Sequence, residues 1–531
     1  MTRIPARGHG HDGSLQRFTT GCSFGVAVVK EPDQARTGRC RQAQKRQSHQ
    51  SLRAQTKHIV FSLAAHPSAL PQIVNDKRWC GSGRLDTPCQ GGVLYRFSPS
   101  LSLSARGAAT AGKGPNVSRS THLIRPFRGL RVRPELAADI TAPPYDVMNS
   151  EEARQMAAGK PDSFLHVSRP EIDVPGARPG DPATYAAARA AFERLIREGK
   201  LIRDEQPRLY LYRLTRNGRA QLGIVAEVLV QAYLDGRVRR HEFTRPDKED
   251  DRTRHVEAIN ANSGPVFLIY RDRSALHGLL HDWVDAHAPD VDFVADDGVR
   301  HELWVIDDSD VIREVVDEIE AGGALYIADG HHRCAAAARV CQTRRNQGAN
   351  SADAPWEAFL GVAFPDSELE ILDYNRVVRD LNGLDESEFL ERIRESFAVE
   401  PADEPVHPSN HGEFGMYLGG KWYRLRYLGK IPTDPVGHLD VSILATELLD
   451  PVLGIKDARR DERINFVGGI RGLSELERLV DSGEYAVAFA MRPTDIDELL
   501  AVADAGEVMP PKSTWFEPKL RDGMVIQQLE D

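Results

Sequence analysis

The chain has 531 residues, of which 41% are hydrophobic and 27% charged, an ordinary composition for a globular protein of about two to four domains. It contains no run of about 18 apolar residues and no signal-peptide pattern, so we expect neither a membrane span nor a membrane partner. Residues 1–120 contain 18 Lys and Arg and 5 Asp and Glu, which leaves a net charge of about −23 on the rest and argues against broad binding to nucleic acid.

The first 116 residues show little sustained helical or strand periodicity and are rich in Arg, Ser, Gly and Gln. Such a segment buries too little apolar surface to offset the entropy of ordering it. We expect residues 1–116 to be a disordered extension, or translated non-coding sequence upstream of a true start near Val117. A basic targeting peptide and a nucleic-acid-binding tail are the alternatives. The ordered part is then 117–531, with an N-terminal part at 117–300 and a C-terminal part at 301–531.

The ordered part mixes strand-like and helix-like segments without a strict βαβ order. Residues 185–198 predict a helix with one apolar face, which Gly199 ends. Two strand-like runs flank Asn217-Gly218, a pair typical of β-hairpin turns. Further strands are predicted at 263–272, 301–308, 324–328, 356–365 and 369–378, a hairpin at 412–428, a loop at 342–355, and helices at 310–320, 381–398, 440–450, 473–482 and 494–504. This mixture predicts an α+β fold with mixed sheets.

The most informative segment is Asp-Gly-His-His-Arg at 329–333, between the strand-like run at 324–328 and an alanine-rich, helix-like stretch. Backbone N–H groups at a helix start, a permissive glycine, two histidines and an arginine predict an anion site. The aspartate suits a metal ion or a substrate hydroxyl. The alternative is a polar helix cap with a surface salt bridge.

The cysteines do not form a metal or disulfide framework. Cys22, Cys40, Cys80 and Cys89 lie in the first segment, and no C-x-x-C pair occurs. Cys334 and Cys341 are seven residues apart on one face of the predicted helix, which predicts two buried thiols. A reducing cytoplasm fits this pattern best.

Gly330, Arg333 and Ala336 stand at a G-x-x-R-x-x-A spacing that resembles the phosphate-binding box of the ParB/sulfiredoxin superfamily. In that superfamily the arginine and the helix start cradle nucleotide phosphates, which suits a planar fork of donors and a helix dipole. Sulfiredoxins have a cysteine two residues before the arginine, where this chain has His331, so thiol repair is disfavoured. The free serine kinases of the superfamily carry Asp-Gly-His-x-Arg, which this chain matches from Asp329 to Arg333.

From about residue 122 to 531 the chain resembles the domain of unknown function 1015 family, often labelled ParB-like. The matching pieces, in the family's order, are RPFRGLR, APPYDV, RHEFTRPDKEDDR, NANSGPVFLIY, DGHHR, DYNRVVRDL, LDVSIL, DPVLGI and MPPKSTWFEPKL. The resemblance implies a ParB/sulfiredoxin-like core that bears the Asp-Gly-His-His-Arg turn, plus additional α/β elements. It implies an activity only through the more distant kinases.

The same resemblance implies roles for individual residues. The serine kinases have a histidine-glutamate pair upstream of their box, so Glu242 is the expected general base, and Asp329 and His331 complete the catalytic set. Candidates for binding the nucleotide are Gly330, His332, Arg333, Lys248, Arg252, Lys512, Ser513 and Thr514. Candidates for binding the substrate are Tyr145, Asp146 and His241.

Each of these segments has a simpler alternative. The charged run at 239–262 is otherwise a solvated stretch leading into a helix, and Tyr145-Asp146 a simple turn after two prolines. Lys512-Ser513-Thr514 lacks the glycine loop of a Walker motif, and for Lys519 the simpler alternative is a surface charge. Adjacent histidines usually diverge, so Mg²⁺ held by Asp329 and by phosphates is favoured over a transition metal at His331 and His332.

The leading hypothesis is an enzyme that uses ATP or ADP with Mg²⁺ to phosphorylate a small hydroxylated metabolite, with free L-serine first. Its partners are then the nucleotide and the small molecule. One alternative is a ParB-like, nucleotide-gated module that binds DNA or protein, although no basic recognition helix is evident. A non-catalytic nucleotide sensor is the third class.

Overall fold

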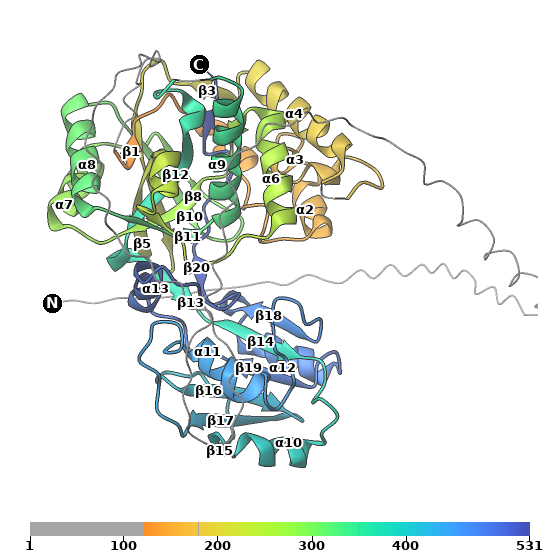
Figure 1. Ribbon diagram of the computed structural model, residues 1–531. Helices are drawn as coiled ribbons and strands as arrows, with labels where there is room; N and C mark the ends of the chain where they lie inside the picture. Colours follow the sequence, from red (N-terminus) through yellow and green to blue (C-terminus); the bar gives the residue numbers. More distant parts are fainter. Residues whose placement is uncertain (1–121, 179, 350, 531) are drawn as a thin grey trace, which may run out of the picture. The chain divides into compact units, whose positions relative to one another are not determined.

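The computed structural model describes residues 122–178, 180–349 and 351–530, and the predictions for 1–116 lie outside this part. The described chain is a mixed α+β protein with several sheets, which confirms the predicted class (Figure 1). Within these residues no helix combines the length and apolar character that a membrane span needs. The proposed division at residue 300 stays a prediction.

The main sheet has nine strands in the order β6-β11-β8-β12-β5-β4-β10-β9, with β1 beside β5. Parallel pairs (β8 with β12, β6 with β11) sit among antiparallel ones, so the sheet is mixed. The strands are β1 Ile124–Arg125, β4 Leu209–Arg216, β5 Arg219–Leu229, β6 Val238–Arg239, β8 Val266–Tyr270, β9 Val291–Val294, β10 Arg300–Ile306, β11 Leu325–Asp329 and β12 Ala358–Pro365.

One face of this sheet packs against α7 (Ser274–Ala286), α8 (Ser309–Gly322) and α9 (His331–Asn346) in a single apolar cluster (Figure 1). That cluster contains both Cys334 and Cys341, which confirms the two predicted buried thiols. The opposite face packs against segments around α4 (Pro182–Arg197) and the end of α6 (Pro246–Ile259). Shorter helices are α1 Ala137–Ile140, α2 Ser150–Ala157, α3 Leu165–Ser168 and α5 Val230–Leu234.

A six-stranded antiparallel sheet follows in the order β15-β17-β16-β19-β14-β18. Its strands are β14 Tyr374–Val378, β15 Phe397–Ala402, β16 Glu413–Leu418, β17 Lys421–Tyr427, β18 Ile464–Gly468 and β19 Val487–Ala490. The later helices are α10 Glu386–Ile393, α11 Asp440–Leu444, α12 Leu473–Asp481 and α13 Ile496–Asp504.

The C-terminal segment contributes one strand to each of two small sheets. β20 (Trp515–Glu517) pairs with β13 (Glu370–Leu372), and β21 (Val525–Gln528) joins a small sheet with β2 (Leu130–Val132), β3 (Leu201–Arg203) and β7 (Ala261–Asn262). The N–H of Met509 donates to the carbonyl of His241 at 2.9 Å. The tail therefore runs past the segment that follows β6 before it reaches the small sheet.

Most local predictions are confirmed. Asn217 and Gly218 take left-handed φ values of 51° and 80° and close the β4–β5 hairpin, as a type I′ turn requires. The predicted loop at 342–355 is wrong in part because α9 continues to Asn346. The helix predicted at 381–398 is confirmed only over α10, Glu386–Ile393. The backbone of Asn382 and Gly383 is left-handed, which excludes them from a helix, and β15 begins at Phe397.

Candidate functional site

The Asp-Gly-His-His-Arg segment lies where β11 meets α9, as the sequence predicts, but α9 already begins at His331. Gly330 has a φ of +100° and precedes the helix. A Cβ atom at this position would lie 3.1 Å from Nε of Arg333 and 3.4 Å from Cα of Val266. Both the left-handed backbone and the close approach of β8 therefore require glycine here.

A cavity of about 240 Å³ opens beside this turn. Its walls come from five separate stretches of the chain, and they bring together many of the predicted site residues. The polar lining residues are Asp146, His241, Glu242, Asp329, His331, Tyr374, Lys512, Ser513, Thr514 and Lys519.

Asp329 is paired with a residue of the C-terminal tail. Its Oδ2 accepts a hydrogen bond from Nζ of Lys519 at 3.0 Å, and its Oδ1 lies 3.8 Å from Nη2 of Arg333. Burial alone would raise the pKa of Asp329, but Lys519 and Arg333 outweigh it and hold that pKa well below its usual range. The simpler alternative for Lys519, a surface charge, is wrong, because the C-terminal tail places Lys519 in the cavity beside Asp329.

Glu242 is half-buried in the same cavity. Burial raises its pKa, Lys512 acts to lower it, and the charge of Asp329 raises it further. A carboxylate whose pKa is raised toward neutrality accepts a proton better than an ordinary surface glutamate. Glu242 and Asp329 therefore occupy one cavity with opposite pKa shifts, a pattern typical of sites that divide proton transfer and charge binding between two carboxyls.

The two histidines of the turn diverge. Nε2 of His331 accepts from the N–H of His241 at 3.5 Å, and the two rings meet edge to face with centroids 4.6 Å apart. Burial lowers the pKa of both, that of His241 to about 4, so both rings are neutral at pH 7. Nε2 of His332 instead accepts from the N–H of Arg245 at 3.0 Å, and His332 does not line the cavity.

Arg333 lies behind the cavity rather than in its lining. It donates to the carbonyl of Pro265, and its Nη2 is 3.7 Å from Asp146. Arg252 stacks on the ring of Tyr145 at 4.0 Å and pairs with Asp251. With Asp522, the residues Tyr145, Arg252 and Arg333 surround a small hollow of about 30 Å³. These predicted residues therefore support the turn from behind.

Lys248 and Asp522 lie outside the cavity of about 240 Å³. Lys248 is exposed at the start of α6 and lines a separate surface hollow with Asp247 and Asp251. Asp522, which we did not predict, is 2% exposed, and its Oδ1 has no hydrogen-bond partner. Its only sequence signal is its place just after the matching MPPKSTWFEPKL segment.

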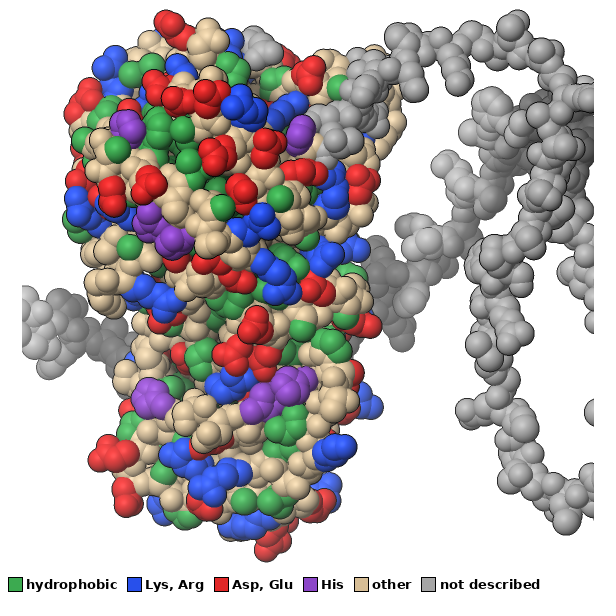
Figure 2. Space-filling view, turned by 90° about the vertical axis from the view of Figure 1, so that its left-hand side faces the viewer, with side chains coloured by type: hydrophobic (Ala, Val, Ile, Leu, Met, Phe, Trp, Pro, Cys, Tyr) green, Lys and Arg blue, Asp and Glu red, His purple; other side chains and the backbone are tan. Residues whose placement is uncertain are grey.

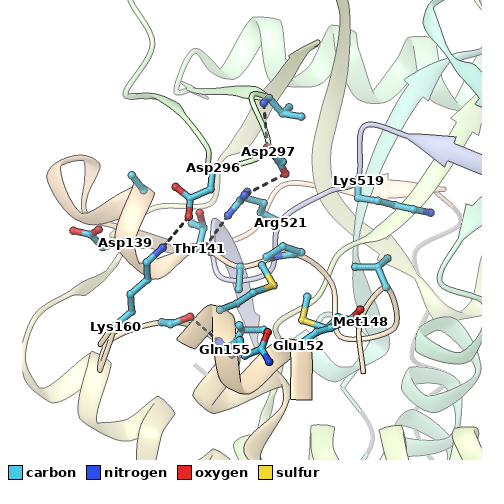
Figure 3. A pocket seen from close by; sticks show the side chains of 18 of the residues that line it. Asp139, Thr141, Met148, Glu152, Gln155, Lys160, Asp296, Asp297, Lys519 and Arg521 are labelled. Carbon is cyan, nitrogen blue, oxygen red and sulfur yellow. Dashed lines mark hydrogen bonds and ion pairs between the residues drawn. The ribbon is translucent and has the colours of Figure 1, made fainter. Parts of the chain in front are cut away.

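A larger cavity of about 760 Å³ adjoins the first, because Val147 and Lys519 line both. Figure 3 shows Lys519 at one side of it and the ion pair of Lys160 with Asp296 at the other. Arg521 donates to the carbonyl of Thr141 at 3.0 Å. Together with these polar groups, the side chain of Met148 gives the larger cavity a mixed apolar and polar wall.

Asp522→Asn is expected to flatten part of the pH dependence of stability. Burial raises the pKa of Asp522 to about 7, and Arg333 offsets this only in part. An unfolded aspartate has a pKa of about 4. Between about pH 4 and pH 7 the folded state therefore binds more protons than the unfolded state, and the free energy of unfolding falls as pH rises through this window. Asparagine does not titrate, so this fall is absent from the variant. Its free energy of unfolding, relative to that of wild type, rises by on the order of 2 kcal/mol from pH 5 to pH 8.

Urea denaturation of both proteins at several pH values measures this difference. Parallel profiles for wild type and variant over that window would show that Asp522 does not titrate as described.

Comparison with known proteins gives one family and several distant structures. A family model described as a protein of unknown function, DUF1015, matches residues 124–442. No curated protein matches the chain. A mutant free serine kinase in complex with AMP is 15% identical, with 55% of this chain and 86% of that chain covered and a TM-score of 0.28.

Two other structures show the same degree of likeness. A conserved hypothetical protein from Pyrococcus furiosus is 15% identical over 56% of this chain and 93% of its own, with a TM-score of 0.28. SbnI with a C-terminal truncation, from Staphylococcus aureus, is 13% identical over 56% and 85%, with a TM-score of 0.31.

Proposed function

The chain belongs to the DUF1015 family of proteins of unknown function. We propose that it transfers a phosphoryl group from a nucleotide to the hydroxyl of a small metabolite. Free L-serine is the first acceptor to test. The observation that carries the proposal is the shared cavity, in which Glu242, with its raised pKa, lies beside Asp329, Lys512 and Lys519. A proton acceptor and cations in one cavity are what such a transfer needs.

The phosphates are held at the β11–α9 turn. The ammonium groups of Lys512 and Lys519 neutralise negative charge, and the N–H groups that open α9 add the positive end of a helix dipole. We further propose that β11, Gly330 and α9 form a phosphate box of the ParB/sulfiredoxin type. Arg333 then fixes the turn through Pro265 and adds positive potential from behind.

The carboxylates of Asp146 and Asp329 in one cavity fit Mg²⁺, which prefers oxygen ligands, and they leave Glu242 free to act as the base. Asp146 and Asp329 would hold the ion together with the phosphates, and Mg²⁺ would supply charge neutralisation there. Asp329 stays ionised for this role because its pKa is held low.

In the transfer itself, the acceptor hydroxyl oxygen forms a bond to the terminal phosphorus, and the bond from that phosphorus to the bridging oxygen breaks. The hydroxyl proton goes to Glu242. The nucleotide leaves one phosphate shorter, and its new negative charge is held by the lysines. The neutral rings of His241 and His331 form a wall that orients groups by hydrogen bonding rather than by charge.

The two adjoining cavities bind different parts of the substrates, the phosphates with the acceptor in one and the nucleoside in the other. A cavity of about 240 Å³ takes phosphates and a small acceptor, whereas sites for larger ligands have volumes of about 300–1,000 Å³. The nucleoside therefore belongs in the neighbouring space of about 760 Å³, on the far side of Lys519. The thioether of Met148 contributes apolar surface for a base there.

Met148→Trp is expected to raise the KM for the nucleotide about tenfold and to leave kcat nearly unchanged, because the indole fills space away from the reacting atoms. Met148→Leu keeps the volume and serves as the control. Steady-state kinetics with varied nucleotide and saturating acceptor measures both. A fall in kcat at constant KM would place the nucleoside elsewhere.

The activity is tested by incubating the full chain with ATP or ADP, Mg²⁺ and L-serine and following phosphorus by NMR. Formation of a phosphomonoester resonance with loss of the terminal nucleotide phosphate supports the proposal. A panel of other hydroxy compounds identifies the acceptor if serine fails. Nucleotide hydrolysis stimulated by DNA would instead favour a ParB-like module, and tight binding without turnover a sensor.

A further inference from the structure

A second cluster of ligand-type side chains lies at the opposite end of β8 from the Asp-Gly turn. Asp329 pairs with Phe267 near the start of β8, whereas Asp272 follows the end of that strand. β8 and β12 are parallel neighbours, so their carboxyl ends meet at one edge of the sheet. Asp272 follows β8 and Glu368 follows β12, and both therefore reach this edge.

Helix α7 adds two histidines to the same edge. His277 and His281 are one helical turn apart, so both side chains lie on one helix face, with ring centroids 4.2 Å apart. Oε1 of Glu368 is 3.3 Å from Nε2 of His281 and 3.7 Å from Nδ1 of His277. Oδ2 of Asp272 is 4.0 Å from Nδ1 of His277.

The separations of Glu368 from the two histidines, 3.3 Å and 3.7 Å, are close to those around a tetrahedral zinc ion. Ligand atoms that surround zinc at about 2.1 Å lie about 3.4 Å from one another. The ligand oxygen of Glu368 is already oriented, because its other oxygen, Oε2, accepts from the N–H of Leu222 at 2.6 Å. The histidine side chains are 43% and 42% exposed, so an ion reaches them from solvent.

A buried tyrosine beside the cluster gives independent support. Tyr270 is 3% exposed, and its hydroxyl has no hydrogen-bond partner within the described chain. Tyr270 is the last residue of β8, at the end of the strand that leads into Asp272. A buried hydroxyl without a partner is costly, and water or a ligand oxygen at the proposed ion satisfies it.

A second group of histidines in the described chain is not expected to bind a metal ion. His411, His438 and Glu498 also have ligand atoms within 4.8 Å of one another. There, however, Nη2 of Arg492 lies 2.8 Å from Oε1 of Glu498, and Nε of Arg492 lies 2.7 Å from Asp440. The guanidinium already occupies the position that a cation would take, so this group serves as a natural control.

We propose that His277, His281 and Glu368 bind a divalent transition metal, with zinc as the expected ion and with Asp272 beside His277. Imidazole nitrogens and carboxylate oxygens are common zinc ligands, and the site draws them from α7 and from the segment after β12. Figure 2 views the molecule from the side on which α7 lies in Figure 1, and histidine side chains reach the surface there. The ion links the start of α7 to the segment after β12, away from the proposed phosphoryl-transfer site.

Zinc titration of the chelator-treated full chain, followed by calorimetry, tests the site. We expect the double variant H277A/H281A to lose zinc affinity at this site by at least about 100-fold, and H411A/H438A to bind as wild type does. Glu368→Gln keeps a hydrogen-bond acceptor for Leu222 but weakens the ligand oxygen, so it too binds zinc more weakly. Equal unfolding midpoints in chelator show that the variants are folded.

Cobalt provides a second readout, because a tetrahedral cobalt site absorbs visible light strongly. Wild type and H411A/H438A should give this absorption, and H277A/H281A should lose it. Zinc binding and cobalt absorption that are unchanged in both H277A/H281A and Glu368→Gln would overturn the proposal, as would a wild-type chain that takes up neither ion.

Discussion

Glu242→Gln is expected to lower kcat/KM for phosphoryl transfer by about 10²–10⁴-fold, the usual contribution of a positioned general base. The glutamine keeps the size and polarity of the side chain but cannot accept the hydroxyl proton. Nucleotide affinity should change little, because the phosphates are held by Lys512, Lys519 and the start of α9. Steady-state kinetics and equilibrium binding of the nucleotide separate these two effects.

The pH profile gives the same prediction a second readout. Burial raises the pKa of Glu242, and only the ionised form acts as a base, so wild-type activity should fall as pH drops through this raised pKa. The residual activity of the variant should lack that limb. Glu257→Gln is the matched control, since Glu257 is exposed on α6 and does not line the cavity. Equal losses in both variants, or an unchanged acidic limb in Glu242→Gln, would remove Glu242 from this role.

Arg333→Met is expected to destabilise the fold by about 3–5 kcal/mol, the usual cost of removing one partner from a buried charge cluster. The side chain of Arg333 is 11% exposed and lies 3.7 Å from Asp146 and 3.8 Å from Asp329. It also donates to the carbonyl of Pro265. Methionine leaves these acceptors without their cation, although Lys519 still pairs with Asp329.

Urea denaturation at constant pH measures this loss, and an unchanged m-value shows that the extent of unfolding is the same. Arg339→Met is the control on the same helix, because Arg339 is exposed and pairs with Asp250 and Glu249 at the surface. We expect that variant to change stability by less than about 1 kcal/mol. Similar small losses for both arginines would mean that Arg333 does not stabilise the turn.

Much of the local structure follows from the sequence because it depends on neighbouring residues. Asn217 and Gly218 accept the left-handed backbone of a hairpin turn, and apolar spacing over 473–482 marks the buried face of α12. Gly330 between an apolar run and an alanine-rich stretch likewise marks a strand-to-helix turn. The capping box of α2, with Asn149 and Glu152, was present in the sequence as well, and that helix was not predicted.

The composition of the site, by contrast, depends on long-range strand pairing. Backbone preference and local periodicity are enough to specify the strand-to-helix turn, its glycine and the residue types around it. Tertiary packing alone brings Lys519 to within 3.0 Å of Asp329, and it leaves Arg333 behind the cavity and Lys248 outside it. The pairing of β20 with β13 and of β21 with β2 and β7 positions that tail, and such pairings join residues far apart in the chain that no local pattern connects.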